Sequence, residues 1–363
     1  MYQRRQVSTL ADRLSEDGIW TMQFVVGPRQ TGKSTLITQA LGLFGGVSHF
    51  VSADDVANPN AAWIEREWQI ARDMTRHGSQ KVILCLDEVQ KVDEWARQVK
   101  ALYDRDRRTN TPVRAVLSGS SSLLLHKGME DSLMGRFEII RSPHWSLDEC
   151  REAFGFTLDQ FLYFGGYPGA AAFVSDERRW RAYVRDAIAE PTVAKDVLEM
   201  AEVRKPALMR ALFRLGCAYS AQELSYTKML GQLQDKGNTV TIAHYLDLLG
   251  KAGMISALPK FSDKEIAKRR STPRLMVHDT SLMTALSDKG QDAFLAAGDL
   301  RGHLVESAIG AYLIARSGCE GFDVMWWREG NKEVDFVIRD GSALTAIEVK
   351  GGAEAGQSGM ADF

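Results

Sequence analysis

The sequence predicts an α/β protein that begins with a parallel sheet covered by helices and continues into a helical part and a smaller α+β end. Three observations support this prediction. Short apolar runs alternate with amphipathic stretches through the first third, an almost wholly helical stretch follows from about residue 147, and three β runs follow residue 300. We place the domain boundaries at 1–145, 146–275 and 276–363 of the 363 residues.

The elements of the first domain alternate regularly. The run 81–87 is continuously apolar, as a strand covered on both faces must be. Strands separated by helices form βαβ units, so we expect their sheet to be parallel. The expected strands are 20–26, 48–53, 81–87 and 113–120, and the expected helices are 31–41, 61–74 and 95–106.

The second domain is predicted to be helical, with breaks at 165–169, Pro191 and Pro206. Residues 207–260 give helix, turn, helix and then a β segment, which is the order of a winged helix. Beyond residue 300, a long helix leads into β runs at 323–328, 333–340 and 343–350. These runs predict a small α+β domain.

The amino-acid composition of the chain excludes some classes of function. The chain has 45 Lys+Arg and 47 Asp+Glu, a net charge of −2, which excludes a globally basic nucleic-acid coat. No apolar run reaches the length of a membrane span, and the first residues lack a signal peptide's apolar stretch. Four scattered cysteines without metal-like spacing are typical of reduced thiols. We therefore expect a cytoplasmic protein without membrane contact.

A phosphate-binding loop is predicted between the first strand and the first helix, because residues 27–34 fit G-x-x-x-x-G-K-[ST]. Glycines let successive N–H groups face the phosphates, and the helix N-terminus adds a positive dipole end. Lys33 is expected to reach the β- and γ-phosphates, and Ser34 to ligate Mg²⁺. The loop residues expected to bind ATP are Gly27, Pro28, Arg29, Gln30, Thr31, Gly32, Lys33, Ser34 and Thr35.

Two carboxylates follow the apolar strand 81–87. Asp87 is placed to hold the magnesium shell, and Glu88 to activate the attacking water as a general base. A merely solvated strand end is the alternative. At the end of the next strand, Ser118 or Ser120 is a candidate sensor of the γ-phosphate, and the alternative is an ordinary Ser/Gly turn.

Arg136 is the candidate for positive charge at the transition state, supplied in cis or by a neighbouring subunit. Such a neighbour would make the protein an oligomer. The alternative is that Arg136 makes only a surface salt bridge.

The runs GPRQTGKST, LDEVQ, LSGSSSLLL and LMGRFEII resemble a group of prokaryotic AAA-type ATPases that carry a C-terminal domain of unknown function. The resemblance continues through FGGYPGA and ends with KEVDFVI and IEVKGG, so that it covers essentially the whole chain. It implies an ATPase with a parallel sheet, the cofactors ATP and Mg²⁺, and a nuclease-like fold at the C-terminus.

The C-terminal β runs carry a second candidate site. A hairpin at Asp340 and Gly341 would make the strands antiparallel, and alternation would put Glu348 and Lys350 on one face. Asp335 and Glu348 could then share a Mg²⁺ while Lys350 orients a water.

This segment resembles PD-(D/E)xK phosphodiesterases, which implies a restriction-endonuclease-like α+β fold. Glu306 matches the acidic residue that the first helix of such folds often adds. The alternative is a chance set of charges on paired strands. Such folds normally continue with a further helix and strand, whereas 13 residues follow Lys350, so we expect this domain to be incomplete.

A basic stretch follows the predicted winged helix and is a candidate phosphate contact. The alternative is a solvated face on a packing module. Between residues 260 and 274 lie the six basic residues Lys260, Lys264, Lys268, Arg269, Arg270 and Arg274, with the acidic residues Asp263 and Glu265.

The sequence is therefore compatible with two main functions. In the first, ATP hydrolysis is coupled to a nuclease-like domain that acts on nucleic acid. In the second, the protein is a non-cleaving, ATP-dependent switch that binds DNA or a protein partner. A third and simpler interpretation is an ATPase whose C-terminal domain serves only assembly.

Overall fold

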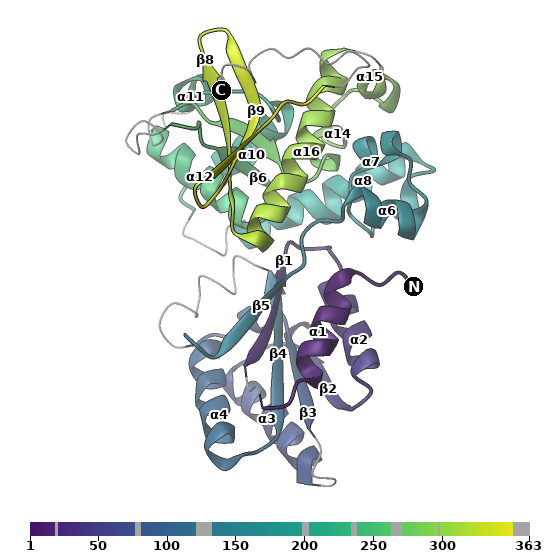
Figure 1. The fold of residues 1–363 in the computed structure, drawn as a ribbon, viewed down its shortest axis with the longest axis vertical. Helices are drawn as coiled ribbons and strands as arrows, with labels where there is room; N and C mark the ends of the chain where they lie inside the picture. Colours follow the sequence, from purple (N-terminus) through teal and green to yellow (C-terminus); the bar gives the residue numbers. More distant parts are fainter. Residues whose placement is uncertain are drawn as a thin grey trace. The chain divides into compact units, whose positions relative to one another are not determined.

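A computed structural model describes residues 1–18, 21–76, 81–120, 133–197, 203–233, 238–262, 271–296 and 298–350. The chain divides into two compact units, Met1–Pro143 and His144–Phe363 (Figure 1). The finer division into three domains stays a prediction.

The first unit is built on a five-stranded sheet in which every pairing is parallel, which confirms the predicted sheet. The strand order is β2-β3-β4-β1-β5. β5 was not predicted, because it is a short edge strand that is only partly buried and has no apolar run. The strands are β1 (Met22–Gly27), β2 (Val47–Ser52), β3 (Val82–Asp87), β4 (Val113–Ser120) and β5 (Phe137–Arg141).

Helices cover both faces of this sheet (Figure 1). Leu10 of α1 and Ile37 of α2 pack on one face, and Trp68 of α3 and Trp95 of α4 pack on the other. The helices are α1 (Arg5–Ser15), α2 (Lys33–Phe44), α3 (Ala61–Arg76) and α4 (Trp95–Thr109), with short turns η1 (Ala53–Asp55) and η2 (Val89–Lys91). α1 was not predicted, although its buried residues follow helical spacing.

The second unit is mainly helical, as expected. Capping boxes begin α6 at Ser146 and α7 at Thr157. Its first helices are α6 (Leu147–Phe154), α7 (Leu158–Phe164), η3 (Ala171–Phe173) and α8 (Glu177–Tyr183), followed by the π-helical segments η4 (Val184–Ala189) and η5 (Thr192–Val197). The later helices are α10 (Pro206–Ala218), α11 (Tyr226–Leu233), α12 (Thr239–Lys251), α14 (Ser281–Thr284), α15 (Gln291–Leu295) and α16 (Asp299–Glu320).

The predicted break at Pro191 is wrong, because the helical path continues from residue 177 to residue 197. Pro191 lies between the two π-helical segments, whose wider turns relieve the clash of the ring with the preceding turn. Pro206 is the first residue of α10, where a proline is well tolerated because that N–H has no intrahelical acceptor.

Two small antiparallel sheets complete the second unit. β6 (Ile255–Leu258) pairs with β7 (Arg274–Val277) after helix α12, an order compatible with the predicted winged helix, which stays a prediction. The second sheet has the order β10-β9-β8, with β8 (Asp323–Glu329), β9 (Lys332–Asp340) and β10 (Ala343–Ile347). Its predicted hairpin is confirmed, although Gly341 and Ser342 form the connection between Asp340 and Ala343.

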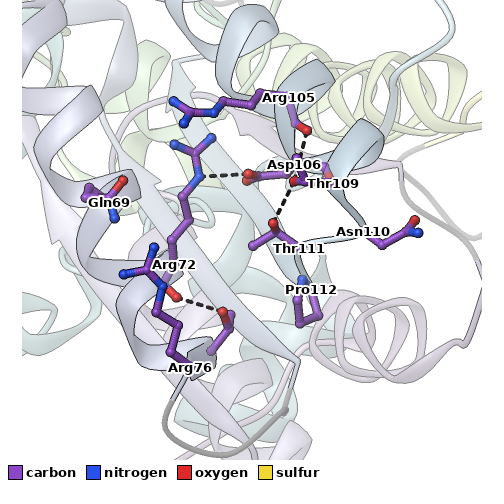
Figure 2. A pocket seen from close by; sticks show the side chains of 10 residues that line it. Gln69, Arg72, Arg76, Arg105, Asp106, Thr109, Asn110, Thr111 and Pro112 are labelled. Carbon is purple, nitrogen blue, oxygen red and sulfur yellow. Dashed lines mark hydrogen bonds and ion pairs between the residues drawn. The ribbon is translucent and has the colours of Figure 1, made fainter.

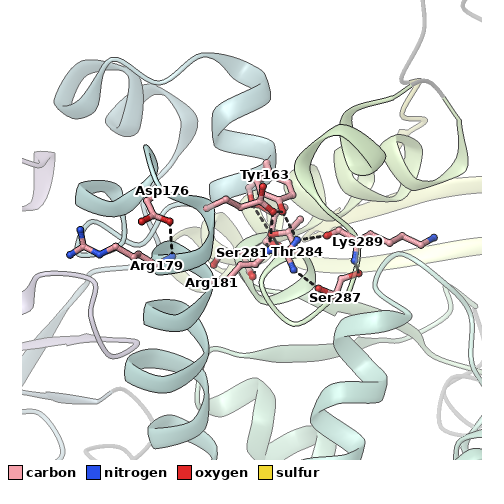
Figure 3. Close-up of polar contacts among 10 residues, drawn as sticks. Tyr163, Asp176, Arg179, Arg181, Ser281, Thr284, Ser287 and Lys289 are labelled. Atoms are coloured by element: carbon pink, nitrogen blue, oxygen red, sulfur yellow. Dashed lines mark hydrogen bonds and ion pairs between the residues drawn. The ribbon is translucent and has the colours of Figure 1, made fainter.

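A partly buried arginine joins distant segments of the second unit (Figure 3). Arg181 of α8 donates to Glu177 at 2.9 Å, to the Tyr163 hydroxyl at 2.7 Å, and to the backbone carbonyls of Ser287 and Lys289. Tyr163 in turn donates to Glu177 at 2.7 Å. This network fastens the turn after α14 to α7 and α8.

In the first unit, Asp106 joins α3 to α4. Its carboxylate accepts from Trp68 Nε1 at 2.6 Å and from Arg72 Nε at 2.7 Å, and its side chain is 3% exposed. These side chains adjoin a polar cavity of about 620 Å³ that Arg76 and Arg105 also line (Figure 2). The cavity lies near the C-terminal ends of both helices, where basic side chains complement the helix dipoles.

We predict that Asp106→Ala lowers the free energy of unfolding by about 3–5 kcal/mol, because Arg72 keeps a buried charge without its carboxylate. Asp73→Ala is the matched control, since the Asp73–Arg76 pair is exposed, and should change stability by less than about 1 kcal/mol. Urea denaturation of both variants checks this. Equal losses would show that Asp106 does not hold α3 and α4 together.

Candidate functional site

The loop Gly27–Lys33 joins the end of β1 to the start of α2. Gly32 has φ +86°, a left-handed conformation that favours glycine. Position 27 requires a glycine because the backbone of Ser142 comes very close to it: a Cβ on residue 27 would lie 2.0 Å from the Ser142 carbonyl oxygen. Lys33 Nζ donates to the carbonyl oxygens of Gly27 at 3.1 Å and Pro28 at 2.9 Å. The lysine ammonium group is therefore folded over the loop.

Asp87 connects this loop with the two neighbouring strands. Ser34 of α2 donates to Asp87 Oδ2 at 2.7 Å, and Ser118 of β4 donates to Asp87 Oδ1. Asp87 and Ser118 are both buried. The structure thus brings together three residues that the sequence predicted separately, at the carboxyl edge of the sheet, where open α/β sheets bind ligands.

Glu88 has an uncommon backbone conformation, with φ +52°. Its carboxylate accepts from Gln90 Nε2 at 2.6 Å. The sequence predicts no role for Gln90, because a glutamine two residues past a pair of carboxylates carries no signal of its own. Strained residues cluster at functional sites, where the surrounding structure holds them in place.

Ser120 pairs through its backbone with Gly27, which puts the end of β4 beside the phosphate loop. The Ser120 side chain lies outside the described part of the structure. Ser118 is the serine whose hydroxyl contacts Asp87.

Arg136 lies at the opposite edge of the sheet from the phosphate loop. It directly precedes β5, whose Phe137 is paired with Met22 at the start of β1, so Arg136 and Gly27 are roughly 20 Å apart along the strand. Its guanidinium makes two hydrogen bonds to Asp104, at 2.8 and 3.1 Å. The in cis role predicted for Arg136 is therefore wrong, and a role at a neighbouring subunit stays a prediction.

The residues around the loop fit ATP and Mg²⁺. The first N–H groups of α2 have no intrahelical acceptors and face the loop, where phosphates would accept from them. The Ser34 hydroxyl and the Asp87 carboxylate are oxygen ligands, and magnesium usually takes only one or two such protein ligands beside water and phosphate. Such a site needs no larger acidic cluster, and the described residues contain no group of three or more Asp, Glu, His or Cys suited to a metal.

In the second unit, the predicted C-terminal residues also converge. Burial and the nearby charge of Asp335 raise the pKa of Glu306 to about 7, opposed by the positive charges of Arg274 and Lys350. Lys350 Nζ lies 2.5 Å from Glu348 Oε1, and this hydrogen bond raises the pKa of Lys350. Glu348 and Lys350 follow the last residue of β10 instead of lying within the strand.

Arg274 joins this group, which the sequence did not predict. The arginine is 4% exposed, and its guanidinium lies 3.3 Å from Asp335 Oδ1 and is paired with Glu333. The phosphate contact expected of Arg274 is therefore wrong. Lys260 lies over the Trp326 ring, and Lys264, Lys268, Arg269 and Arg270 lie outside the described residues.

The backbone of the glycine pair 165–166 packs against the buried carboxylate of Asp279. A Cβ on Gly165 would lie 2.0 Å from Asp279 Oδ1, and Asp279 accepts from the Gly166 N–H at 2.7 Å. Burial raises the pKa of Asp279 to about 6. The motif FGGYPGA is thus explained by backbone packing against Asp279.

Comparison with known families supports the first site. Residues 20–151 match the AAA domain family. Residues 155–293 match a domain of unknown function (DUF8612), and residues 301–363 match another (DUF4143).

Curated relatives carry no assigned function. An uncharacterized protein of Methanocaldococcus jannaschii is 26% identical over 70% of this chain and 58% of its own length. An uncharacterized protein of Haemophilus influenzae is 20% identical over 90% of this chain and 82% of its own length. The chain thus spans little more than half of the archaeal relative.

Among solved structures, the Thermotoga maritima RuvB Holliday junction branch migration motor is 12% identical, covers 70% of this chain and 88% of its own, and has a TM-score of 0.35. A TM-score this low does not establish a shared fold. No described helix is long and apolar enough to cross a membrane. The sheet, the phosphate loop and the family match together support an AAA-type ATPase domain in the first unit.

Proposed function

We propose that the first unit binds and hydrolyses ATP at the carboxyl edge of its sheet. The observation that carries this proposal is the set of hydrogen bonds that Asp87 accepts from Ser34 and Ser118, directly beside the phosphate loop. They support the proposal because a carboxylate and a hydroxyl beside the phosphate loop are suitable ligands for a magnesium ion bound to the nucleotide.

Each residue has a distinct role in this proposal. When ATP binds, the Lys33 ammonium group gives up its hydrogen bonds to the carbonyl oxygens of Gly27 and Pro28 and donates to the β- and γ-phosphates instead. Ser34 and Asp87 would hold Mg²⁺, and a bound Mg²⁺ would supply positive charge beside the phosphates. Glu88, positioned by Gln90, accepts the proton of the attacking water. Ser118 donates a hydrogen bond to Asp87, so a movement of the Asp87 carboxylate on nucleotide binding would also move the end of β4.

A second candidate function belongs to the C-terminal cluster. The approach of Glu306, Asp335, Glu348 and Lys350 to one another supports a nuclease-like site that acts on nucleic acid under control of the ATPase. The alternative is a non-cleaving switch, in which the nucleotide state changes how the second unit binds DNA or a protein partner. The contacts of Arg274 favour this alternative.

We predict that Lys33→Ala binds ATP roughly 10–100-fold more weakly, because the phosphates lose a charge-assisted hydrogen bond. Arg97→Ala, a charge removed from the exposed surface of α4, is the control and should bind normally. Fluorescent-nucleotide titration measures both. Wild-type affinity in Lys33→Ala would rule out the loop assignment.

We predict that Glu88→Gln keeps ATP affinity and loses about 10²–10⁴-fold in turnover, since the amide cannot accept the proton. Phosphate release under saturating MgATP gives the turnover. Gln90→Ala should show a smaller loss in turnover, because it removes only the hydrogen bond that positions Glu88. Unchanged turnover in Glu88→Gln would exclude Glu88 as the base.

A plasmid-cleavage assay with Mg²⁺ or Mn²⁺, with and without ATP, separates the two C-terminal functions. The non-cleaving switch predicts intact plasmid together with full ATP hydrolysis. Cleavage that Glu348→Ala and Lys350→Ala both abolish would instead establish the nuclease.

A further inference from the structure

The C-terminal carboxylates already have cations of their own. Arg274, Arg328 and Lys350 meet Glu333, Asp335 and Glu348 in this part of the second unit. Arg274 lies between two of the carboxylates, because its guanidinium pairs with both Glu333 and Asp335. A guanidinium stays charged at any pH that leaves the protein folded. The cluster therefore contains a permanent internal cation.

At least five of the six carboxylate oxygens of Glu333, Asp335 and Glu348 already contact a donor of the protein. Asp335 Oδ1 is 3.3 Å from Arg274, and Asp335 Oδ2 accepts from the Val349 N–H at 2.7 Å. Glu333 uses one oxygen for Arg274 and the other for Arg328, which lies 2.5 Å away. Glu348 Oε1 is bonded to Lys350.

Arg274 is also fixed in place. It is the first residue of β7, paired with Leu258, and its backbone forms a bridge to Glu223. Its guanidinium lies 5.4 Å from the centre of the Trp326 ring. Pulling a buried guanidinium away from its carboxylates would leave an uncompensated charge, which proteins tolerate poorly.

The magnesium ion expected between Asp335 and Glu348 does not fit this arrangement. Magnesium demands near-octahedral oxygen coordination. The fixed guanidinium beside Asp335 and the ammonium beside Glu348 occupy acceptor positions on these carboxylates, and their positive charges oppose a second cation. Among the described residues, no group of three or more acidic, His or Cys side chains is suited to a metal.

We infer that Arg274 is the resident cation of this cluster and that its guanidinium excludes divalent metal ions from Asp335. The cluster is then a metal-free, arginine-held site in the second unit. This inference does not rest on ATP hydrolysis, and its test is done without nucleotide.

Mn²⁺ binding to the full chain tests the inference, with the free ion followed by its paramagnetic resonance signal. Every protein carries Asp87→Asn, so that the phosphate-loop site lacks its carboxylate ligand. With Arg274 intact, the chain should show no Mn²⁺ binding that depends on Asp335. Arg274→Met should bind Mn²⁺ at least about tenfold more tightly, and adding Asp335→Asn should remove the gain.

Arg339→Met is the matched control. Arg339 also lies against an aromatic ring, that of Phe261 at 5.3 Å, and it is on β9, the strand that carries Asp335. It should leave Mn²⁺ affinity unchanged. The inference would be overturned if the chain with Arg274 intact bound Mn²⁺ and Asp335→Asn abolished that binding. This comparison does not depend on whether Arg274→Met folds. Folded Arg274→Met without any gain in Mn²⁺ affinity would also overturn it.

Thermal unfolding separates exclusion of the metal from a merely structural role. Arg274→Met should unfold at a lower temperature, because buried carboxylates lose their counter-ion. Mn²⁺ should then raise the midpoint of Arg274→Met, and should not raise that of Arg274→Met/Asp335→Asn. A lower midpoint that Mn²⁺ does not restore would mean that the arginine only supports the fold.

Discussion

The carboxylate of Asp87 is the contact on which the first unit's chemistry depends. It ends β3, accepts from Ser34 at the start of α2 and from Ser118 near the end of β4, and so connects the ends of two neighbouring strands with the helix that follows the phosphate loop. Hydroxyl groups are exchangeable donors, because a metal or a water can replace them at little cost. A carboxylate held in this way is well defined in position and still available to a ligand.

Asp335 shows how the same residue type acquires a different character in other surroundings. Its oxygens accept from a buried guanidinium and from a backbone N–H, and neither donor moves without a local change in the fold. Two acidic positions that look alike in the sequence thus differ in what they can bind. The difference lies in the partners: small hydroxyls at Asp87, and a fixed cation at Asp335.

Much of this architecture could be predicted because local patterns carry it. The continuous apolar run 81–87, the glycines at 27 and 32 and the alternation of strands and helices are properties of short segments. What could not be predicted depends on long-range packing. Arg274 lies 61 residues before Asp335, and its partner is decided by how β7 and β9 meet. Arg136 has a suitable side chain, yet the direction of β5 puts it at the wrong edge of the sheet for its own loop.

The most direct test of the account is the effect of Mg²⁺ on ATP affinity in the wild-type chain, in Asp87→Asn and in Ser118→Ala. Isothermal titration with Mg²⁺ and with EDTA gives the contribution of the metal in each protein. If Asp87 holds the metal, Mg²⁺ should tighten ATP binding in the wild type and in Ser118→Ala, and Asp87→Asn should lose most of this gain. An equal gain in all three proteins would contradict the role of Asp87 and, with it, the proposed ATPase site.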